Sequence, residues 1–348
     1  MTGSRPILIT GALGWLGKRL TRLLAGGEYN FLLGSRPEVR CLVLPGQDSG
    51  ELRAMGPHVR VIVGDLRSPA DCARFLESSA EAVLVHTAGI IHPRRVREFY
   101  EINVQGAVNL LAAAKNAGLR RAVVVSSNSP FGANPHPDHL FDEDSPYHPY
   151  RNYGRSKMMM EEAAIEAGRS RTLETVIVRP PWFYGPDQPP RQTLFFRMVK
   201  QGRAPLVGGG DHLRSMAYID NLVQGLLLAA THPAAAGQLY WIADRRPYAM
   251  NEIIDTIERL LEEEFYIPVA HRRLRLPGIA GTMAGAADAL LQAAGLYHQK
   301  IHVLSEMNQT IACCIHKAER ELGYRPQVGL EEGMRRSIRW CLDQGIAI

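Results

Sequence analysis

Three glycines spaced three residues apart limit what the start of this chain can fold into. Gly11, Gly14 and Gly17 form the run GALGWLG, directly after the apolar stretch 7–10 and at the start of a helical pattern over 15–24. Such a turn presents backbone N–H groups at the positive end of a helix, where a pyrophosphate binds. Glycine turns also occur for packing alone, but a position at the first strand-to-helix turn favours dinucleotide binding.

Short β-branched runs alternate with helical stretches through the first half of the chain, which is typical of βαβ units in a doubly wound parallel α/β sheet. We expect strands at 7–10, 40–44, 59–63, 82–86, 122–126 and 175–179, and helices at 15–24, 69–76, 99–117 and 153–167. Prolines then cluster over 180–190, which indicates a change of region. We therefore predict a Rossmann domain over 1–180 and a smaller substrate-binding lobe over 181–348, whose segments 215–230 and 238–245 pack back on the first domain.

Composition excludes several classes of protein. The 348 residues are 46% hydrophobic and carry a formal net charge of only +5, which is too weak to indicate a nucleic-acid partner. Five cysteines without a CxxC pair indicate a reducing compartment, and no signal-peptide pattern is present, so a cytoplasmic location is expected. His136, His139 and His148 lie in a proline-punctuated polar stretch without regular ligand spacing, so no metal site is predicted.

A tyrosine and a lysine four residues apart indicate the chemistry. Tyr153 and Lys157 open a predicted helix, where residues at this spacing share one face. An ammonium beside a phenol stabilises the phenolate, so Tyr153 is expected to exchange protons near neutral pH. Chance spacing on a solvated helix is the alternative. It is disfavoured because Ser126 and Ser127 end a strand, and strand ends in such sheets face the ligand crevice.

Taken together, the motifs resemble those of an extended short-chain dehydrogenase/reductase, in the superfamily of NAD-dependent epimerases/dehydratases and 3β-hydroxysteroid dehydrogenase-like enzymes. Besides GALGWLG, the matching segments are GDL (64–66), HTAGI (86–90), NVQG (103–106), VVVSSNSPFG (123–132), YGRSK (153–157), VRPPWFYGP (178–186), AYIDNL (217–222) and ELGYRP (321–326). The resemblance implies an NAD(P)-dependent oxidoreductase that moves hydride to or from the carbon of a secondary alcohol or ketone.

The same resemblance implies roles for individual residues. Tyr153 and Ser127 would bond the substrate oxygen while the tyrosine moves a proton, with Ser126 the less favoured hydroxyl. Lys157 would hold the nicotinamide ribose. Asn103 corresponds to the asparagine of a proton relay, although helix capping or packing explains it nearly as well. The implied cofactor-binding positions are Gly11, Gly14, Trp15, Leu16, Gly17, Asp65, Leu66, Ala88, Gly89, Tyr153, Lys157 and Pro180.

The choice between NAD and NADP is left open by the second strand. In NAD-binding sheets this strand ends in an acid that accepts the ribose hydroxyls. Here it ends in Leu44, and the nearest charges are Arg36, Arg40 and Asp48. The missing acid and the two arginines favour NADP slightly.

Two substrate classes fit the later motifs. Nucleotide-sugar enzymes carry an asparagine where this chain has Trp182, but Arg214 matches an arginine that contacts the sugar diphosphate. The segments AYIDNLVQG and YWIADRRPYAMNEI resemble those of the hydroxysteroid dehydrogenase branch. Trp182, Phe183 and Phe131 would form an apolar pocket for such a substrate, unless their rings belong to the core. A hydrophobic, hydroxysteroid-like substrate is therefore placed slightly ahead of a nucleotide sugar, and Asn128 joins Trp182 and Arg214 as a candidate substrate residue.

Three further expectations concern partners. The apolar stretch 276–296 either covers the substrate lobe, which is favoured, or contacts a membrane peripherally. The family habit implies a homodimer through the helices 99–117 and 153–167. A cofactor-binding sensor or scaffold without turnover is the second functional alternative, and the presence of Ser127, Tyr153 and Lys157 argues against it.

Overall fold

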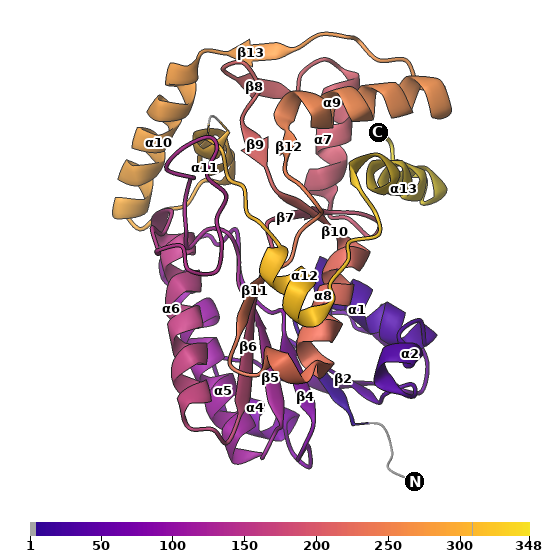
Figure 1. Cartoon of the computed structure of the whole chain (residues 1–348), viewed down its shortest axis with the longest axis vertical. Helices are drawn as coiled ribbons and strands as arrows, with labels where there is room; N and C mark the ends of the chain where they lie inside the picture. Colours follow the sequence, from indigo (N-terminus) through magenta and orange to yellow (C-terminus); the bar gives the residue numbers. More distant parts are fainter. Residues whose placement is uncertain (1–4, 308) are drawn as a thin grey trace.

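Seven parallel strands form the central sheet. The computed structural model describes residues 5–307 and 309–348. Across the sheet the strands follow the order β11-β6-β5-β4-β1-β2-β3 (Figure 1). Their bounds are β1 (Ile7–Thr10), β2 (Val39–Val43), β3 (Val59–Val63), β4 (Val83–His86), β5 (Arg121–Val125), β6 (Glu174–Arg179) and β11 (Leu239–Trp241). The order reverses between β1 and β4, where sheets of this kind bind ligands beyond the carboxyl ends of their strands.

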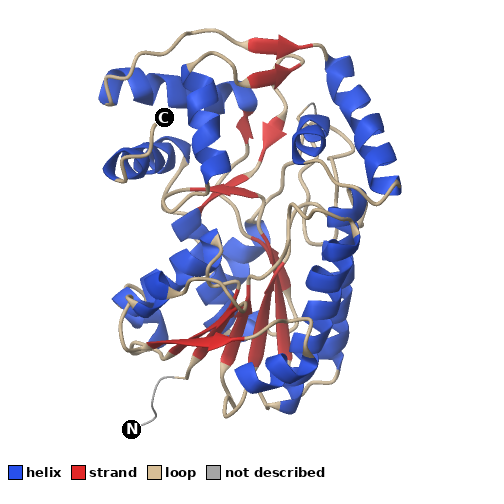
Figure 2. Ribbon diagram, turned by 180° about the vertical axis from the view of Figure 1, so that it is seen from behind, coloured by secondary structure: helices blue, strands red, loops and turns tan. Residues whose placement is uncertain are grey.

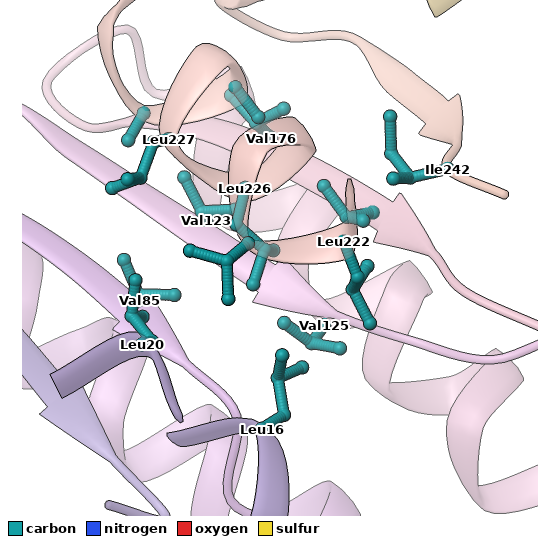
Figure 3. Packing of buried hydrophobic residues seen from close by; sticks show 14 of the residues in the cluster. Leu16, Leu20, Val85, Val123, Val125, Val176, Leu222, Leu226, Leu227 and Ile242 are labelled. Atoms are coloured by element: carbon teal, nitrogen blue, oxygen red, sulfur yellow. The ribbon is translucent and has the colours of Figure 1, made fainter. Parts of the chain in front are cut away.

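Helices cover both faces of this sheet (Figure 2). One face carries α4 (Pro69–Phe75), α5 (Gly106–Asn116) and α6 (Arg151–Arg169), and the other carries α1 (Trp15–Gly26) and α8 (Ile219–Thr231). Leu222 and Leu226 of α8 are fully buried in the cluster that also holds Val123 and Leu20 (Figure 3). Each such leucine contributes about 1.5–3 kcal/mol by leaving water, so α8 and β11 join the sheet although they follow residue 180.

The remainder of the chain forms a smaller region beyond the carboxyl ends of the strands (Figure 1). It pairs short strands two by two, β10 with β7, β12 with β9 and β13 with β8. Their bounds are β7 (Trp182–Tyr184), β8 (Pro205–Val207), β9 (Leu213–Arg214), β10 (Met216–Tyr218), β12 (Tyr248–Ala249) and β13 (Leu274–Leu276). Its helices are α7 (Pro190–Lys200), α9 (Met250–Arg259), η3 (Leu260–Glu264), α10 (Gly278–Ala293), α11 (Gln299–Glu306) and α13 (Leu330–Asp343). Two further short helices, η2 (Pro233–Ala235) and α12 (His316–Leu322), pack instead against α8 at the sheet.

Several predicted elements have different ends in the structure. The helix predicted over 99–117 begins as the π-helix η1 (Phe99–Gln105) before α5. The stretch 276–296 is the end of β13 followed by α10, with Pro277 as the N-cap between them. Two short helices, α2 (Asn30–Leu33) and α3 (Gly50–Arg53), flank β2.

Three features of the described residues concern the cysteines, metal binding and membrane crossing. All five cysteines are free. Within residues 5–307 and 309–348, no group of three or more His, Cys, Asp and Glu side chains is arranged to hold a metal ion. In the same part of the chain, no helix combines the length and apolar character needed to cross a membrane.

Candidate active site

The glycine turn leaves no room for side chains. Gly11 has a φ of +72°, and a Cβ there would lie 2.6 Å from the Ala88 nitrogen. A Cβ on Gly17 would lie 2.2 Å from the Gly11 carbonyl oxygen. Gly14 is the N-cap of α1, and no side chain caps this helix end. The first amides of the helix, including those of Trp15 and Leu16, therefore remain available to a pyrophosphate beside a backbone that it can approach closely.

The residues predicted to contact adenosine lie at the carboxyl ends of β2 and β3. Asp65 and Leu66 follow β3, and Asp65 forms an ion pair with Arg67 at 2.6 Å that lowers the pKa of its carboxyl group. The side chain of Leu66 is buried in a hydrophobic cluster, so only its backbone remains for a ligand. Leu44, which follows β2, is exposed.

Arg36 and Arg40 do not favour NADP, contrary to the expectation from the sequence. Arg36 precedes β2 and Arg40 is its second residue, so both lie toward the amino end of the strand, opposite the glycine turn. Arg36 donates to the Gly26 carbonyl, and Arg40 donates to the Glu77 carbonyl at 2.8 Å and pairs with Glu38. The missing acid after β2 is thus the one remaining signal at this position, and it does not select between NAD and NADP.

The residues predicted to contact the nicotinamide half of the cofactor lie where β4, β5 and β6 end. Ala88 and Gly89 follow β4, and the buried Pro180 follows β6. Two buried polar atoms, His86 Nε2 and Ser126 Oγ, have no hydrogen-bond partner. Burial and the nearby Lys157 lower the pKa of His86 to about 3, so this ring is neutral. Unsatisfied buried donors and acceptors are costly, so these atoms, together with the open glycine turn, fit a polar dinucleotide.

Ser127 and Tyr153 come together from β5 and α6. Ser127 lies two residues beyond β5 and is 8% exposed. Burial raises the pKa of Tyr153 to about 12, a hydrogen bond with Ser127 opposes that rise, and Arg191 also lowers the value. Tyr153 is therefore protonated at neutral pH. The lysine was expected to bring the pKa of Tyr153 toward neutral pH, but in this structure burial raises it and Lys157 is not one of the groups that lower it.

Lys157 and Asn103 are held by the surrounding backbone. Lys157 is 4% exposed, donates to the Val125 carbonyl at 2.7 Å, and has a pKa that burial lowers to about 7. Asn103 is fully buried and bonds both backbone groups of Ile90, at 2.8 and 3.1 Å, as well as Ser156 at 3.1 Å. Asn103 thus connects the loop after β4 to the helix that carries Tyr153. These contacts agree with a packing role for Asn103, which was the alternative to a proton relay.

The candidate substrate residues lie at different depths. Asn128 adjoins the site and accepts a hydrogen bond from Ser127 at 3.2 Å. Trp182 is half-buried, with its ring 5.8 Å from that of Phe195 on α7. Arg214 is half-buried on β9 and donates to the Glu306 carbonyl.

The expected contribution of Phe131 and Phe183 to an apolar pocket is not found. Phe131 is 1% exposed and packs among Phe141, Tyr147 and Trp241 in the core. Phe183 packs on Trp15, with ring centroids 4.8 Å apart. Both rings therefore belong to the packing of the fold, which was the alternative interpretation, and the indole N–H of Trp15 is bound by the Pro186 carbonyl.

Sequence patterns did not reveal four residues near Tyr153. Phe99 lies 5.7 Å from the Tyr153 ring and 5.6 Å from the Tyr297 ring, between centroids. The Tyr297 hydroxyl is hydrogen-bonded to His92 Nδ1 at 2.9 Å. Arg191, on the first turn of α7, is close enough to lower the pKa of both phenols. No local spacing marks this group, since its members come from four separate segments.

Comparison with known proteins agrees with this geometry. The model of the NAD dependent epimerase/dehydratase family matches residues 7–243. The uncharacterized protein y4nL of Sinorhizobium fredii is 54% identical over 342 residues, covering 97% of this chain and 96% of that protein. The mouse protein 3 beta-hydroxysteroid dehydrogenase type 7 is 27% identical over 368 residues, covering 96% and 94%.

A solved structure has a similar fold over nearly its whole length. DesIV, a dTDP-glucose 4,6-dehydratase from Streptomyces venezuelae crystallised with NAD and TYD, is 25% identical, with 97% of each chain covered and a TM-score of 0.75. The glycine turn, the seven-stranded sheet and the family match over more than half of the chain lead to one conclusion. The chain belongs to the NAD-dependent epimerase/dehydratase family of extended short-chain dehydrogenases/reductases, whose members are NAD(P)-dependent enzymes.

Proposed function

We propose that the protein moves hydride between NAD(P) and the carbon of a hydrophobic secondary alcohol or ketone, with Tyr153 as general acid and base. The observation that carries this proposal is the placement of a half-buried, protonated Tyr153 beside Ser127 at the carboxyl edge of the sheet. A neutral phenol and a serine hydroxyl are two donors that can hold one carbonyl oxygen.

Each residue then has a defined task. Ser127 donates a hydrogen bond to the substrate oxygen, and Tyr153 gives that oxygen a proton in reduction or receives one in oxidation. A bound nicotinamide supplies the hydride. Lys157, anchored at the Val125 carbonyl, would hold the nicotinamide ribose, and the turn with Gly11, Gly14 and Gly17 would bind the pyrophosphate. In reduction, the ketone gains one hydride and one proton for each NAD(P)H consumed, and becomes the alcohol.

The hydrophobic substrate is supported by Trp182. Trp182 occupies the position at which nucleotide-sugar enzymes carry an asparagine. Its indole ring packs on Phe195 and offers no side-chain amide to a diphosphate. Full-length similarity to a hydroxysteroid dehydrogenase agrees with an apolar substrate. A nucleotide-sugar epimerase or dehydratase is the alternative, which similarity to DesIV supports.

A panel of substrates tests the proposal. The purified protein with NADH or NADPH is offered hydrophobic ketones in one arm and dTDP- or UDP-sugars in another, with NAD⁺ and the corresponding alcohols for the reverse direction. Turnover confined to the apolar arm supports the proposal. Conversion of the nucleotide sugars instead favours the alternative, and cofactor binding without turnover in every arm indicates a sensor or scaffold.

Homodimerisation through η1, α5 and α6 is part of the proposal. Val108 on α5 and Ile165 on α6 are exposed large apolar residues on these helices, at 40% and 38%. Burying them against a second copy would remove apolar surface from water. Sedimentation of the wild-type protein beside a Val108→Glu, Ile165→Glu double variant tests this. A cytoplasmic location is retained as a prediction.

Peripheral membrane contact through α10 also remains a proposal. Ile279, Met283 and Leu290 of this helix are 65%, 65% and 74% exposed, whereas its acid Asp288 is buried. Glycines and alanines dominate the rest of the helix, so the apolar area for insertion is modest. The alternative, that α10 covers the substrate-binding lobe, is supported by its contacts with α6. Asn152 of α6 donates to Gln292, and Arg151 of α6 donates to the Gly285 carbonyl.

A further inference from the structure

Helices α10 and α11 carry a buried polar cluster for which the proposed reaction has no use. Helix α10 is rich in glycine and alanine, yet its Asp288 is fully buried, and Gln292 of the same helix and His302 of α11 are buried beside it. Asp288 and Gln292 are four residues apart and therefore share one face of the helix. That face lies against the start of α6, the helix that carries Tyr153 (Figure 1). A buried carboxylate and amide are costly unless each is fully hydrogen-bonded, so their contacts deserve a role.

Asp288 determines which way the Gln292 amide points. Burial alone would raise the pKa of Asp288, but hydrogen bonds from His302 and Gln292 lower it below its usual value, so the side chain is a carboxylate. A carboxylate only accepts hydrogen bonds. His302 therefore donates through Nδ1 at 2.9 Å, and Gln292 donates through Nε2 to the two carboxylate oxygens at 3.0 and 2.9 Å. The amide oxygen of Gln292 is left to face α6.

This oxygen takes the place of a helix cap at the start of α6. The first amides of a helix have no partner within it, and the side chain of the N-cap residue usually accepts from the second or third of them. The N-cap residue of α6 is Tyr150, whose side chain makes no such bond. Instead, Gln292 Oε1 accepts from the Asn152 amide at 3.1 Å and from the Asn152 side chain at 2.9 Å. Asn152 directly precedes Tyr153.

The first turn of α6 needs such support because its backbone is strained. Arg151 has a φ of +54°, a conformation that residues other than glycine rarely adopt and that persists only where surrounding contacts hold it. Helix α10 supplies these contacts as well. The Arg151 guanidinium donates to the Gly285 carbonyl at 2.8 Å, and its Nε lies 3.8 Å from the Asp288 carboxylate.

The same turn fits closely on the loop after β5. The Tyr150 amide donates to the Ser129 carbonyl at 2.9 Å, and a Cβ on Gly154 would lie only 2.3 Å from that oxygen. Ser129 follows Ser127 by two residues. The position of the Tyr153 phenol relative to Ser127 therefore depends on how the start of α6 is held against this loop.

We propose that Gln292 is a positioning residue for Tyr153: oriented by Asp288, it caps α6 and fixes the strained turn from which the phenol reaches the substrate oxygen beside Ser127. This inference rests on the proposed function, because it concerns the step in which Tyr153 moves a proton. Gln292 acts only through α6. A displacement of about 1 Å at a reacting group lowers a rate about 10²-fold, so loss of the cap should reduce kcat far more than it changes KM.

Gln292→Met tests the inference, because it removes the acceptor at nearly the same side-chain volume. For NAD(P)H-dependent turnover of the substrate identified by the panel, we expect kcat to fall at least about tenfold, with KM and cofactor affinity changed less than about twofold. Hydrogen–deuterium exchange of the peptide 149–158 should rise in this variant, since the Asn152 amide loses its acceptor. Exchange over 160–169, at the other end of α6, should stay unchanged.

Asp288→Asn repeats the test with the side-chain shape preserved, so the inference stays testable if Gln292→Met does not fold. An amide at position 288 allows the Gln292 amide to turn round, so we expect the same pattern with a smaller loss of kcat. The double variant Asp288→Asn, Gln292→Glu again places a donor at 288 and an acceptor at 292. It should turn over substrate faster than Gln292→Met, and a folded double variant that is no faster contradicts the inference.

Ala284→Gly is the matched control. Ala284 is buried on the same helix, and glycine there weakens α10 without removing a hydrogen bond to α6. Its kcat and its exchange over 149–158 should equal those of the wild type. An equal loss of kcat in Ala284→Gly overturns the inference, because any loosening of α10 would then have the same effect. Wild-type kcat in both Gln292→Met and Asp288→Asn overturns it as well.

The two proposals fail in distinguishable ways, because the exchange measurement requires no turnover. If Gln292→Met raises exchange over 149–158 while the wild type turns over no alcohol or ketone, Gln292 holds the first turn of α6 and the proposed function is wrong. If the wild type is active and both exchange and kcat are unchanged in Gln292→Met, the function stands and the positioning role is wrong.

Discussion

A methyl group added at Gly17 should prevent dinucleotide binding. The Cβ of Gly17→Ala would lie 2.2 Å from the Gly11 carbonyl oxygen and 2.8 Å from the Gly11 carbonyl carbon, whereas ordinary van der Waals contact begins at 3.4 Å. The two backbones must therefore separate by about 1 Å, and rigid backbone atoms rather than a flexible side chain must move. Overpacking of this kind costs about 1–3 kcal/mol of stability.

The same displacement moves the helix end that receives the pyrophosphate. We expect the affinity for NADH to fall at least about tenfold, which a fluorescence titration measures directly. Gly14→Ala, whose Cβ would lie 3.1 Å from the same oxygen, should give a smaller loss. A Cβ on Gly285 in α10 would meet the Ser305 Cβ at 3.8 Å and the Arg151 Nη2 at 3.9 Å, both ordinary van der Waals contacts, so Gly285→Ala serves as a control with unchanged affinity. Wild-type affinity in Gly17→Ala, with an unchanged melting temperature, would refute the reasoning.

Two further variants test the packing of the fold. Leu226→Ala should lower the free energy of unfolding, measured in urea, by about 2–5 kcal/mol, because Leu226 is fully buried where α8 packs on the sheet. A loss below about 1 kcal/mol contradicts the packing in Figure 3. Burial raises the pKa of Asp244 from 3.8 to about 6. The folded state therefore favours the protonated acid, and stability should fall by an amount on the order of 2–3 kcal/mol as pH rises from about 4 to 6. Asp244→Asn should remove most of this dependence of the free energy of unfolding on pH. If the urea midpoint depends on pH in the variant as it does in the wild type, Asp244 is not the group responsible.

The sheet could be predicted because its signals are local. Each parallel strand is a short apolar run, and burial on both faces makes such runs stand out between helical stretches. The region after residue 180 was far less predictable. Its strands of two or three residues, such as β9 and β12, pair across distant segments, and propensity over so few residues carries little information.

The residues of the candidate site also differ in how well the sequence predicts them. The glycine turn and the Tyr153–Lys157 spacing are visible in sequence because each lies within a few residues. The His92–Tyr297 contact joins residues 205 positions apart, so no pattern along the chain reports it. Arg40 was misplaced because a charge near a strand does not reveal which end of the strand it faces.

The central claim is that Tyr153 moves the proton that accompanies hydride transfer. The most direct test is the NAD(P)H-dependent turnover of Tyr153→Phe on the substrate identified by the panel, with cofactor affinity measured on the same preparation. Removing a positioned acid reduces the rate about 10²–10⁴-fold, and the phenyl ring preserves the packing on Phe99, so cofactor affinity should be unchanged. Full turnover in Tyr153→Phe would contradict the account.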